Sequence, residues 1–296
     1  MIKQPEKAPV SRREDMIRNL LIKRYFAQGK IPWSQGYLIY RDQFISKTLE
    51  DPDLMSQFQH CRPLPPRYGH ALDERCVEYP WLFAQLEGAP ARVLDAGSAM
   101  NHSFLLDQPI LRNKEMHILT LAPEKDCFWE RGISYFFEDL RNIPVRDNFY
   151  DLVICISTLE HVGFDNRTFT GDATLCENDP DGFVAAMHEM RRVLRSTGQL
   201  LLTVPFGRYR DLGTQQLFTR DLLEKAIAAA GPAEVSRTFF AYSGEGWQFA
   251  DESECEESEY VDWIMLPENL RPSEFPVQSD GAAAARAVAC IKMVKH

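Results

Sequence analysis

The chain lacks any apolar run long enough to cross a bilayer, and its opening residues, MIKQPEKAPVSRRED, contain no hydrophobic stretch of the kind found in signal peptides. A membrane-spanning helix needs about 20 consecutive apolar residues, and a secretory signal needs a shorter apolar core. The sequence therefore predicts a globular protein of the cytoplasm.

Basic charge is also scarce. The 296 residues include 33 Lys and Arg against 43 Asp and Glu, which gives a net charge of -10. Nucleic-acid-binding domains are normally basic, so we expect no nucleic-acid partner. The seven cysteines form no C-x-x-C pair. An odd, scattered set predicts reduced thiols rather than a disulfide framework, and it indicates no zinc site.

A third absence is the G-x-G-x-x-G fingerprint, in which glycines surround the pyrophosphate of a dinucleotide. The corresponding segment reads Asp95-Ala96-Gly97-Ser98, with Ala99 and Asn101 where later glycines would stand. It follows the apolar pair Val93-Leu94, which is typical of a buried parallel strand. Because ligands of open α/β sheets bind at the carboxyl ends of strands, this segment predicts a fold class and a pocket together.

Beyond residue 89, apolar segments alternate between the period of strands and the period of helices. Helices are expected at residues 182–194 and 219–230, the second with Thr219 as its N-cap. Strands are expected at residues 92–95, 116–121, 134–137, 150–157, 199–204, 234–241 and 287–294. This order predicts a doubly wound α/β fold, with a seven-stranded, mostly parallel Rossmann-like sheet.

The sequence also predicts two domains. Residues 1–88 are expected to form an N-terminal helical cap, and residues 89–296 the sheet domain, with an acidic insertion near residues 243–280.

Within the cap, residues 11–28 combine apolar residues at helical spacing with basic ones, and they predict a basic amphipathic helix. We expect this helix to dock on its own domain, with contact to an anionic membrane surface as the alternative. Prolines predict an irregular segment at residues 31–70, and a helix is expected at residues 72–86.

Two longer motifs follow the first strand. Residues 138–161 read EDLRNIPVRDNFYDLVICISTLEH, and residues 189–200 read EMRRVLRSTGQL. These are an acid-Asp-Leu segment, a Pro-containing loop, a Tyr-Asp-Leu-Val strand with a polar end, and then a helix, a turn and a strand. In this order after Asp95-x-Gly97, they resemble class I S-adenosylmethionine-dependent methyltransferases over about residues 91–241.

The resemblance implies an enzyme with S-adenosylmethionine as its cofactor. It places Asp95, Gly97 and Ser98 in the cofactor loop, and Glu138, Asp139 and Leu140 beside the adenine. It also places Thr120 at the ribose and Ser157 at the strand end that faces the methyl group.

Thr120 departs from the family pattern, because this position usually holds an acid that bonds both ribose hydroxyls. A threonine makes one neutral hydrogen bond where a carboxylate makes two charge-assisted ones, and Glu124 is near enough in the chain to replace it. Together with the missing glycines, this departure supports an alternative, a non-catalytic methyltransferase-like partner protein with a degraded cofactor loop. A nicotinamide-dependent oxidoreductase is a third interpretation, disfavoured by the same missing glycines.

The polar residues after the fourth predicted strand are the catalytic candidates. Histidine titrates near neutrality and is the usual general base, so His161 is predicted to deprotonate an alcohol acceptor, oriented by Glu160 or Asp165. Two other interpretations stay open: His161 has a structural role, or the three side chains hold a divalent cation. Their spacing matches no metal motif, so we assign no metal.

Three further stretches indicate the acceptor. Residues 72–81 read LDERCVEYPW, residues 157–163 read STLEHVG, and residues 244–247 read GEGW. They resemble methyltransferases found with surface-polysaccharide biosynthesis. This resemblance implies methylation of an oxygen on a small molecule or glycan precursor, and it leaves the oligomeric state open.

Overall fold

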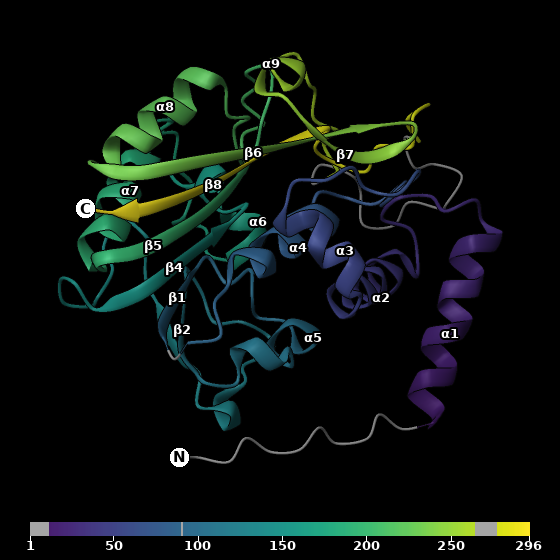
Figure 1. Cartoon of the computed structure of the whole chain (residues 1–296), viewed down its shortest axis with the longest axis horizontal. Helices are drawn as coiled ribbons and strands as arrows, with labels where there is room; N and C mark the ends of the chain where they lie inside the picture. Colours follow the sequence, from purple (N-terminus) through teal and green to yellow (C-terminus); the bar gives the residue numbers. More distant parts are fainter. Residues whose placement is uncertain (1–11, 90, 264–276) are drawn as a thin grey trace. The chain divides into compact units, whose positions relative to one another are not determined.

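The computed structural model describes residues 12–89, 91–263 and 277–296. Its strands form one sheet in the order β3-β2-β1-β4-β5-β8-β6-β7 (Figure 1). The strands are β1 Ala91–Ala96, β2 Lys114–Thr120, β3 Ser134–Phe137, β4 Tyr150–Ile156, β5 Leu194–Pro205, β6 Ala233–Ser243, β7 Gly246–Ala250 and β8 Ala287–Lys295. Strands β3, β2, β1, β4 and β5 pair in parallel, whereas β6 and β7 pair antiparallel.

The strand order reverses between β1 and β4, which makes this the switch point of a doubly wound sheet. Both strands are rich in β-branched and aliphatic residues, and their central residues, including Val93, Leu94 and Ile154, are fully buried. Asp95 pairs in register with Ile154 of β4 and Ile118 of β2, so the three strands end at one level. The register of β1, β2 and β4 therefore places their three ends at a single edge of the sheet.

The predicted doubly wound α/β class is confirmed, and the predicted strands are present. Two details differ. The sheet has eight strands rather than seven among the described residues, and β5 begins at Leu194 rather than at residue 199. The extra strand, β7, lies inside the predicted acidic insertion and follows β6 after only Gly244 and Glu245. A five-residue strand beside an acidic run gives too short an alternation to recognise.

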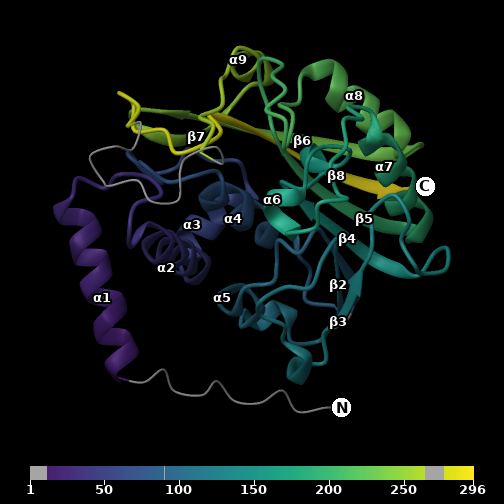
Figure 2. The same ribbon diagram turned by 180° about the vertical axis from the view of Figure 1, so that it is seen from behind.

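Helix α7 (Gly182–Val193) contacts β5, and helix α8 (Arg220–Ala229) contacts α7; the two helices lie side by side in both views (Figures 1 and 2). The Thr219 side chain accepts a hydrogen bond of 3.3 Å from the Leu222 amide, so the predicted N-cap of α8 is confirmed. Shorter elements are α5 Ser103–Leu106, α6 Arg167–Thr170, and the 3-10 helices η1 Pro109–Leu111, η2 Trp129–Arg131 and η3 Leu159–His161.

The N-terminal part contains α1 (Arg12–Ala27), α2 (Tyr37–Glu50), α3 (Pro52–Gln59) and α4 (Arg75–Gln85). The prediction that residues 31–70 are irregular is wrong, because α2 and α3 lie there. Pro52 opens a helix instead of breaking one: it occupies the first turn of α3, where no backbone donor is needed. Asp51 is the N-cap, accepting hydrogen bonds from the amides of Asp53 and Leu54.

The described residues group into two compact units. The sheet unit contains Leu86–Thr238 and Ala289–His296, and the cap unit contains the described residues of Glu6–Gln85 and Phe239–Val288. No helix in the described ranges has both the length and the apolar composition needed to cross a membrane.

In the cap unit, β7 organises the loop at residues 64–72. The Gln248 side-chain amide donates to the Leu64 carbonyl and accepts from the Leu64 amide, both at 2.9 Å. Trp247 donates from its backbone amide to the Tyr68 carbonyl at 2.8 Å and from its ring to the Leu72 carbonyl at 3.0 Å. The GEGW motif therefore contributes to the framework of this unit.

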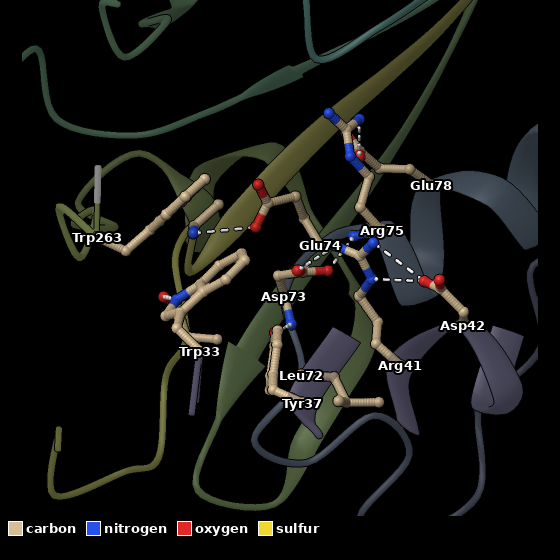
Figure 3. A network of polar contacts seen from close by, with 12 residues as sticks. Trp33, Tyr37, Arg41, Asp42, Leu72, Asp73, Glu74, Arg75, Glu78 and Trp263 are labelled. Atoms are coloured by element: carbon tan, nitrogen blue, oxygen red, sulfur yellow. Dashed lines mark hydrogen bonds and ion pairs between the residues drawn. The ribbon is translucent and has the colours of Figure 1, made fainter. Parts of the chain in front are cut away.

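The LDER motif supplies a buried ionic network in the same unit (Figure 3). Arg41 pairs with Asp73 at 2.9 Å, and Arg75 pairs with Glu78 at 2.9 Å. The buried Glu74 carboxylate accepts a hydrogen bond from the Ala285 amide at 3.2 Å. Burial, together with the negative charges of Asp73 and Glu78, raises the pKa of Glu74 to about 8.

Candidate active site

A cavity of about 610 Å³ opens at the carboxyl ends of β1, β2, β3 and β4, within the sheet unit. Its lining comes from four places: Gly97, residues 119–125, residues 138–141, and residues between 157 and 177. These are the strand ends that the sequence predicts to face a ligand.

The turn after β1 shapes this cavity through its backbone. Asp95 is fully buried, and its Oδ2 accepts a hydrogen bond of 2.8 Å from the Met100 amide. Gly97 lines the cavity with φ at 113°, a conformation that favours glycine, and its amide donates to the Leu119 carbonyl at 2.8 Å. Ser98 Oγ is buried without a hydrogen-bond partner within the described chain. Of these three predicted cofactor residues, Gly97 alone contributes to the lining.

The ends of β2 and β3 meet beside the turn. The Glu138 amide donates to the Thr120 carbonyl at 3.0 Å, which brings the two predicted cofactor segments together. Thr120, Glu138, Asp139 and Leu140 all line the cavity, and so does Glu124. Glu124 and Glu138 therefore line the same cavity as the threonine that occupies the usual acid position.

Arg141 holds Asp139 in place and is a site residue that the sequence pattern does not reveal. Its guanidinium binds the Asp139 carboxylate, with the closest contact from Nη2 to Oδ2 at 2.6 Å. Burial raises the pKa of Asp139, but the hydrogen bonds from Arg141 outweigh it and leave the pKa below its ordinary value. The same guanidinium binds Glu177 with two contacts of 2.7 and 2.8 Å. No sequence signal links residues 36 positions apart.

The end of β4 carries the predicted transfer site. Ser157 is nearly buried and lines the cavity, and its amide donates to the Thr203 carbonyl at 3.0 Å. His161 lines the cavity as well, with Nδ1 at 2.7 Å from the Thr214 carbonyl oxygen. A carbonyl only accepts, so Nδ1 carries the proton, and Nε2 of the neutral ring has the lone pair.

The two acids predicted to orient His161 lie outside the cavity lining. Glu160 is buried, and its backbone carbonyl accepts from the Gln216 amide at 3.1 Å. Asp165 binds Arg167 through two contacts of 2.9 and 2.6 Å, and these hydrogen bonds lower the pKa of Asp165 to about 2. Across the described ranges, no group of three or more His, Cys, Asp or Glu side chains has the arrangement of a metal site.

Residues 115–202 match the family model described as a methyltransferase domain. The match runs from β2 into β5 and begins after the Asp95-Ala96-Gly97 turn. It confirms the resemblance seen in the sequence over these residues, which match a methyltransferase domain. No curated protein sequence matches the chain.

Many solved structures resemble the chain at low identity. A methyltransferase structure from Bacillus halodurans shares 15% identity over 72% of this chain and 96% of its own, with a TM-score of 0.41. The 1,6-didemethyltoxoflavin-N1-methyltransferase of Burkholderia thailandensis, solved with S-adenosylhomocysteine, is 14% identical in sequence, with a TM-score of 0.41. The match covers 99% of this chain and 94% of that one. A methyltransferase from Archaeoglobus fulgidus is 12% identical in sequence, over 82% of this chain and 100% of its own, with a TM-score of 0.45.

Proposed function

We propose that the cavity of the sheet unit binds S-adenosylmethionine and that the chain transfers the methyl group to an oxygen of a small molecule or glycan precursor. The observation that carries this proposal is the convergence of four separate strand ends on one cavity. At about 610 Å³, its volume falls within the range of about 300 to 1,000 Å³ that is usual for small-molecule sites.

The charge of the cavity also fits this cofactor. Four acidic side chains line it, Glu124, Glu138, Asp139 and Glu177, with the two cations Lys125 and Arg141 and the proposed base His161. An acidic lining attracts the positive sulfonium and amino groups of S-adenosylmethionine, whereas it repels a pyrophosphate. This charge, with the missing glycines, favours S-adenosylmethionine over a nicotinamide dinucleotide. Glu124, which lines the same cavity as Thr120, is proposed to supply the carboxylate that Thr120 does not.

The bound cofactor supplies an electrophilic methyl group, and the chain supplies position and a base. Ser157, at the end of β4, is proposed to border the reacting centre. His161 Nε2 is proposed to accept the proton of the acceptor hydroxyl, because the Thr214 carbonyl keeps the ring in the required tautomer and stabilises its protonated form. Glu160 and Asp165 are proposed to support the loop that carries His161.

The acceptor class is supported by the three motifs that resemble polysaccharide-associated methyltransferases. Two of them, LDER and GEGW, form the framework of the cap unit, and the third, STLEHVG, contributes Ser157, Thr158 and His161 to the cavity. A structure determined with S-adenosylhomocysteine tests the assignment. The thioether sulfur is expected beside Ser157 on the side facing His161, and a sulfur placed elsewhere would contradict it.

One observation favours a second candidate, a non-catalytic partner protein. Arg141 binds both oxygens of Asp139, the acid expected beside the adenine. A site whose acid is already paired offers less to a ligand. Failure to bind the cofactor product, together with stoichiometric association with another enzyme, would support this candidate.

We also propose that the protein works in the cytoplasm and that α1 contacts an anionic membrane surface. Tyr25 is buried and packs on the Tyr37 ring, at 6.0 Å between centroids. By contrast, Met16 and Leu20 are 66% and 65% exposed. The exposed cations Arg13, Lys23 and Arg24 share their face of the helix. Exposed apolar residues flanked by cations complement anionic lipid headgroups.

A further inference from the structure

The segment between η3 and α7 forms a closed loop beside the cavity. Its base is held where the Asp179 amide donates to the Gly163 carbonyl at 2.7 Å, and its interior where the Asn166 amide donates to the Leu175 carbonyl at 2.9 Å. Gly163 has φ at 89°, and a Cβ atom there would lie 2.1 Å from the Asp179 carbonyl oxygen. The base of this loop is therefore tightly defined. We call residues 164–181 the cavity loop.

The cavity loop supplies one wall of the cavity on the side of the proposed base. Asn166, Phe169, Thr170, Leu175 and Glu177 all line it. The Phe169 ring meets the His161 ring edge to face, with 5.1 Å between centroids. Because Phe169 is 49% exposed, part of its surface stays available beside His161. The loop thus places an aromatic ring beside the space proposed for the acceptor.

Arg141 joins this loop to the turn after β3, which also lines the cavity. Its guanidinium makes paired contacts with Glu177 on the loop and with Asp139 on the turn after β3. A planar guanidinium fixes two carboxylates in orientation as well as in distance. One cation therefore connects the residue predicted beside the adenine to the wall that borders the acceptor space.

We infer that Arg141 is a positioning residue that couples cofactor binding to the order of the cavity loop, through Asp139 on one side and Glu177 on the other. This inference rests on the proposed cofactor site. A ligand bound against Asp139 limits the freedom of Arg141, and Arg141 in turn holds Glu177 and the wall that carries Phe169. By linkage, a loop held in place also favours the ligand. The acceptor would then meet a formed wall only when the cofactor is present.

Hydrogen exchange of the full-length protein tests the coupling. Amides of residues 164–181 are followed with and without saturating S-adenosylhomocysteine, in wild type and in Glu177→Gln, which leaves the Arg141–Asp139 pair intact. Saturating ligand should slow exchange of the loop about three- to tenfold in wild type. Glu177→Gln should still bind the ligand in calorimetry but lose that slowing.

The matched control is Glu224→Gln, which breaks a similar ion pair with Arg237 outside the cavity lining. In Glu224→Gln, the ligand should slow hydrogen exchange of the cavity loop as much as in wild type. Full ligand-dependent slowing in Glu177→Gln, or equal loss in Glu224→Gln, would overturn the inference. If wild type binds no ligand, the proposed cofactor site fails. The comparison without ligand then still tests the Arg141–Glu177 link. If the loop amides exchange no faster in Glu177→Gln than in wild type, the link is overturned as well.

Discussion

The Thr158 side chain occupies the space that a Cβ atom on Gly97 would need. A Cβ built on Gly97 would lie 2.1 Å from Thr158 Cγ2 and 2.2 Å from its Oγ1. Thr158 Oγ1 is itself fixed by donating to the Ile156 carbonyl at 3.0 Å. The turn after β1 and the end of β4 are thus in contact at the cavity because residue 97 has no side chain.

This contact predicts that Gly97→Ala lowers the free energy of unfolding by about 2 to 4 kcal/mol, from backbone strain and steric overlap together. Adding Thr158→Gly should restore the part due to overlap and leave the part due to φ. Urea unfolding measures both. Gly88→Ala is the control, because a Cβ atom there meets nothing within 4 Å. Equal stability of Gly97→Ala and Gly88→Ala would contradict the proposed contact.

Replacing His161 with Asn should lower kcat by about 10² to 10⁴, the usual contribution of a general base. Affinity for S-adenosylhomocysteine should stay within about twofold, because a side-chain amide can still donate to the Thr214 carbonyl. The rate is measured as S-adenosylhomocysteine release, with an acceptor that wild type methylates from a panel of nucleotide sugars and methyl glycosides. His188→Asn, on the exposed face of α7, is the control. A kcat unchanged in His161→Asn would exclude its role as base.

Glu74 makes stability depend on pH. Its pKa rises from an ordinary value of 4.5 to about 8 on folding, so between these values the folded state holds a proton that the unfolded state has lost. Stability contributed by Glu74 is therefore complete below about pH 4.5 and declines as the pH rises to about 8.

Glu74→Gln removes this titration, and its amide oxygen can still accept from the Ala285 amide. Relative to wild type, the variant should gain stability steadily from pH 4.5 to about 8, then hold a constant advantage. Urea unfolding at several pH values measures the difference. A difference that does not change with pH would show that Glu74 is not the titrating group.

For α1, wild type should sediment with vesicles containing phosphatidylglycerol, and less so at high salt. Leu20→Glu should weaken binding at least about tenfold, because it removes an inserted apolar side chain and adds a negative charge. Leu38→Glu on α2 is the control, since Leu38 is also exposed but lies on another helix. Equal binding to uncharged vesicles, or a dimer that Leu20→Glu dissociates without any vesicle binding, would contradict the membrane proposal.

The sequence predicts the parallel strands and their ends well. Strands buried on both faces must be continuous apolar runs, and the polar residues that stop them mark the edge where a ligand binds. Hence the residue pattern predicts a ligand edge at Gly97 and at the polar residues after β4, including His161, and the family resemblance adds Thr120 and Ser157; all four line the cavity. The helices α2 and α3 were hidden by Pro52, because a proline at a first helical turn resembles one that breaks a helix.

Side-chain partners depend on tertiary contacts and could not be predicted. The Asp95 carboxylate is directed to the Met100 amide, and Asp139 is bound by Arg141. Arg141 and Glu177 are distant in sequence and acquire a common role only when the cavity loop folds beside the turn after β3. The periodicity of the sequence carries no information about such pairs.

Calorimetric titration with S-adenosylhomocysteine tests the central claim most directly. We expect saturable one-to-one binding to wild type, weakened about 10- to 100-fold in Glu124→Gln if this carboxylate bonds the ribose, and only about 2- to 10-fold in Thr120→Val, which removes one neutral hydrogen bond. The absence of binding heat at millimolar ligand would show that the cavity is not a cofactor site and would contradict the account.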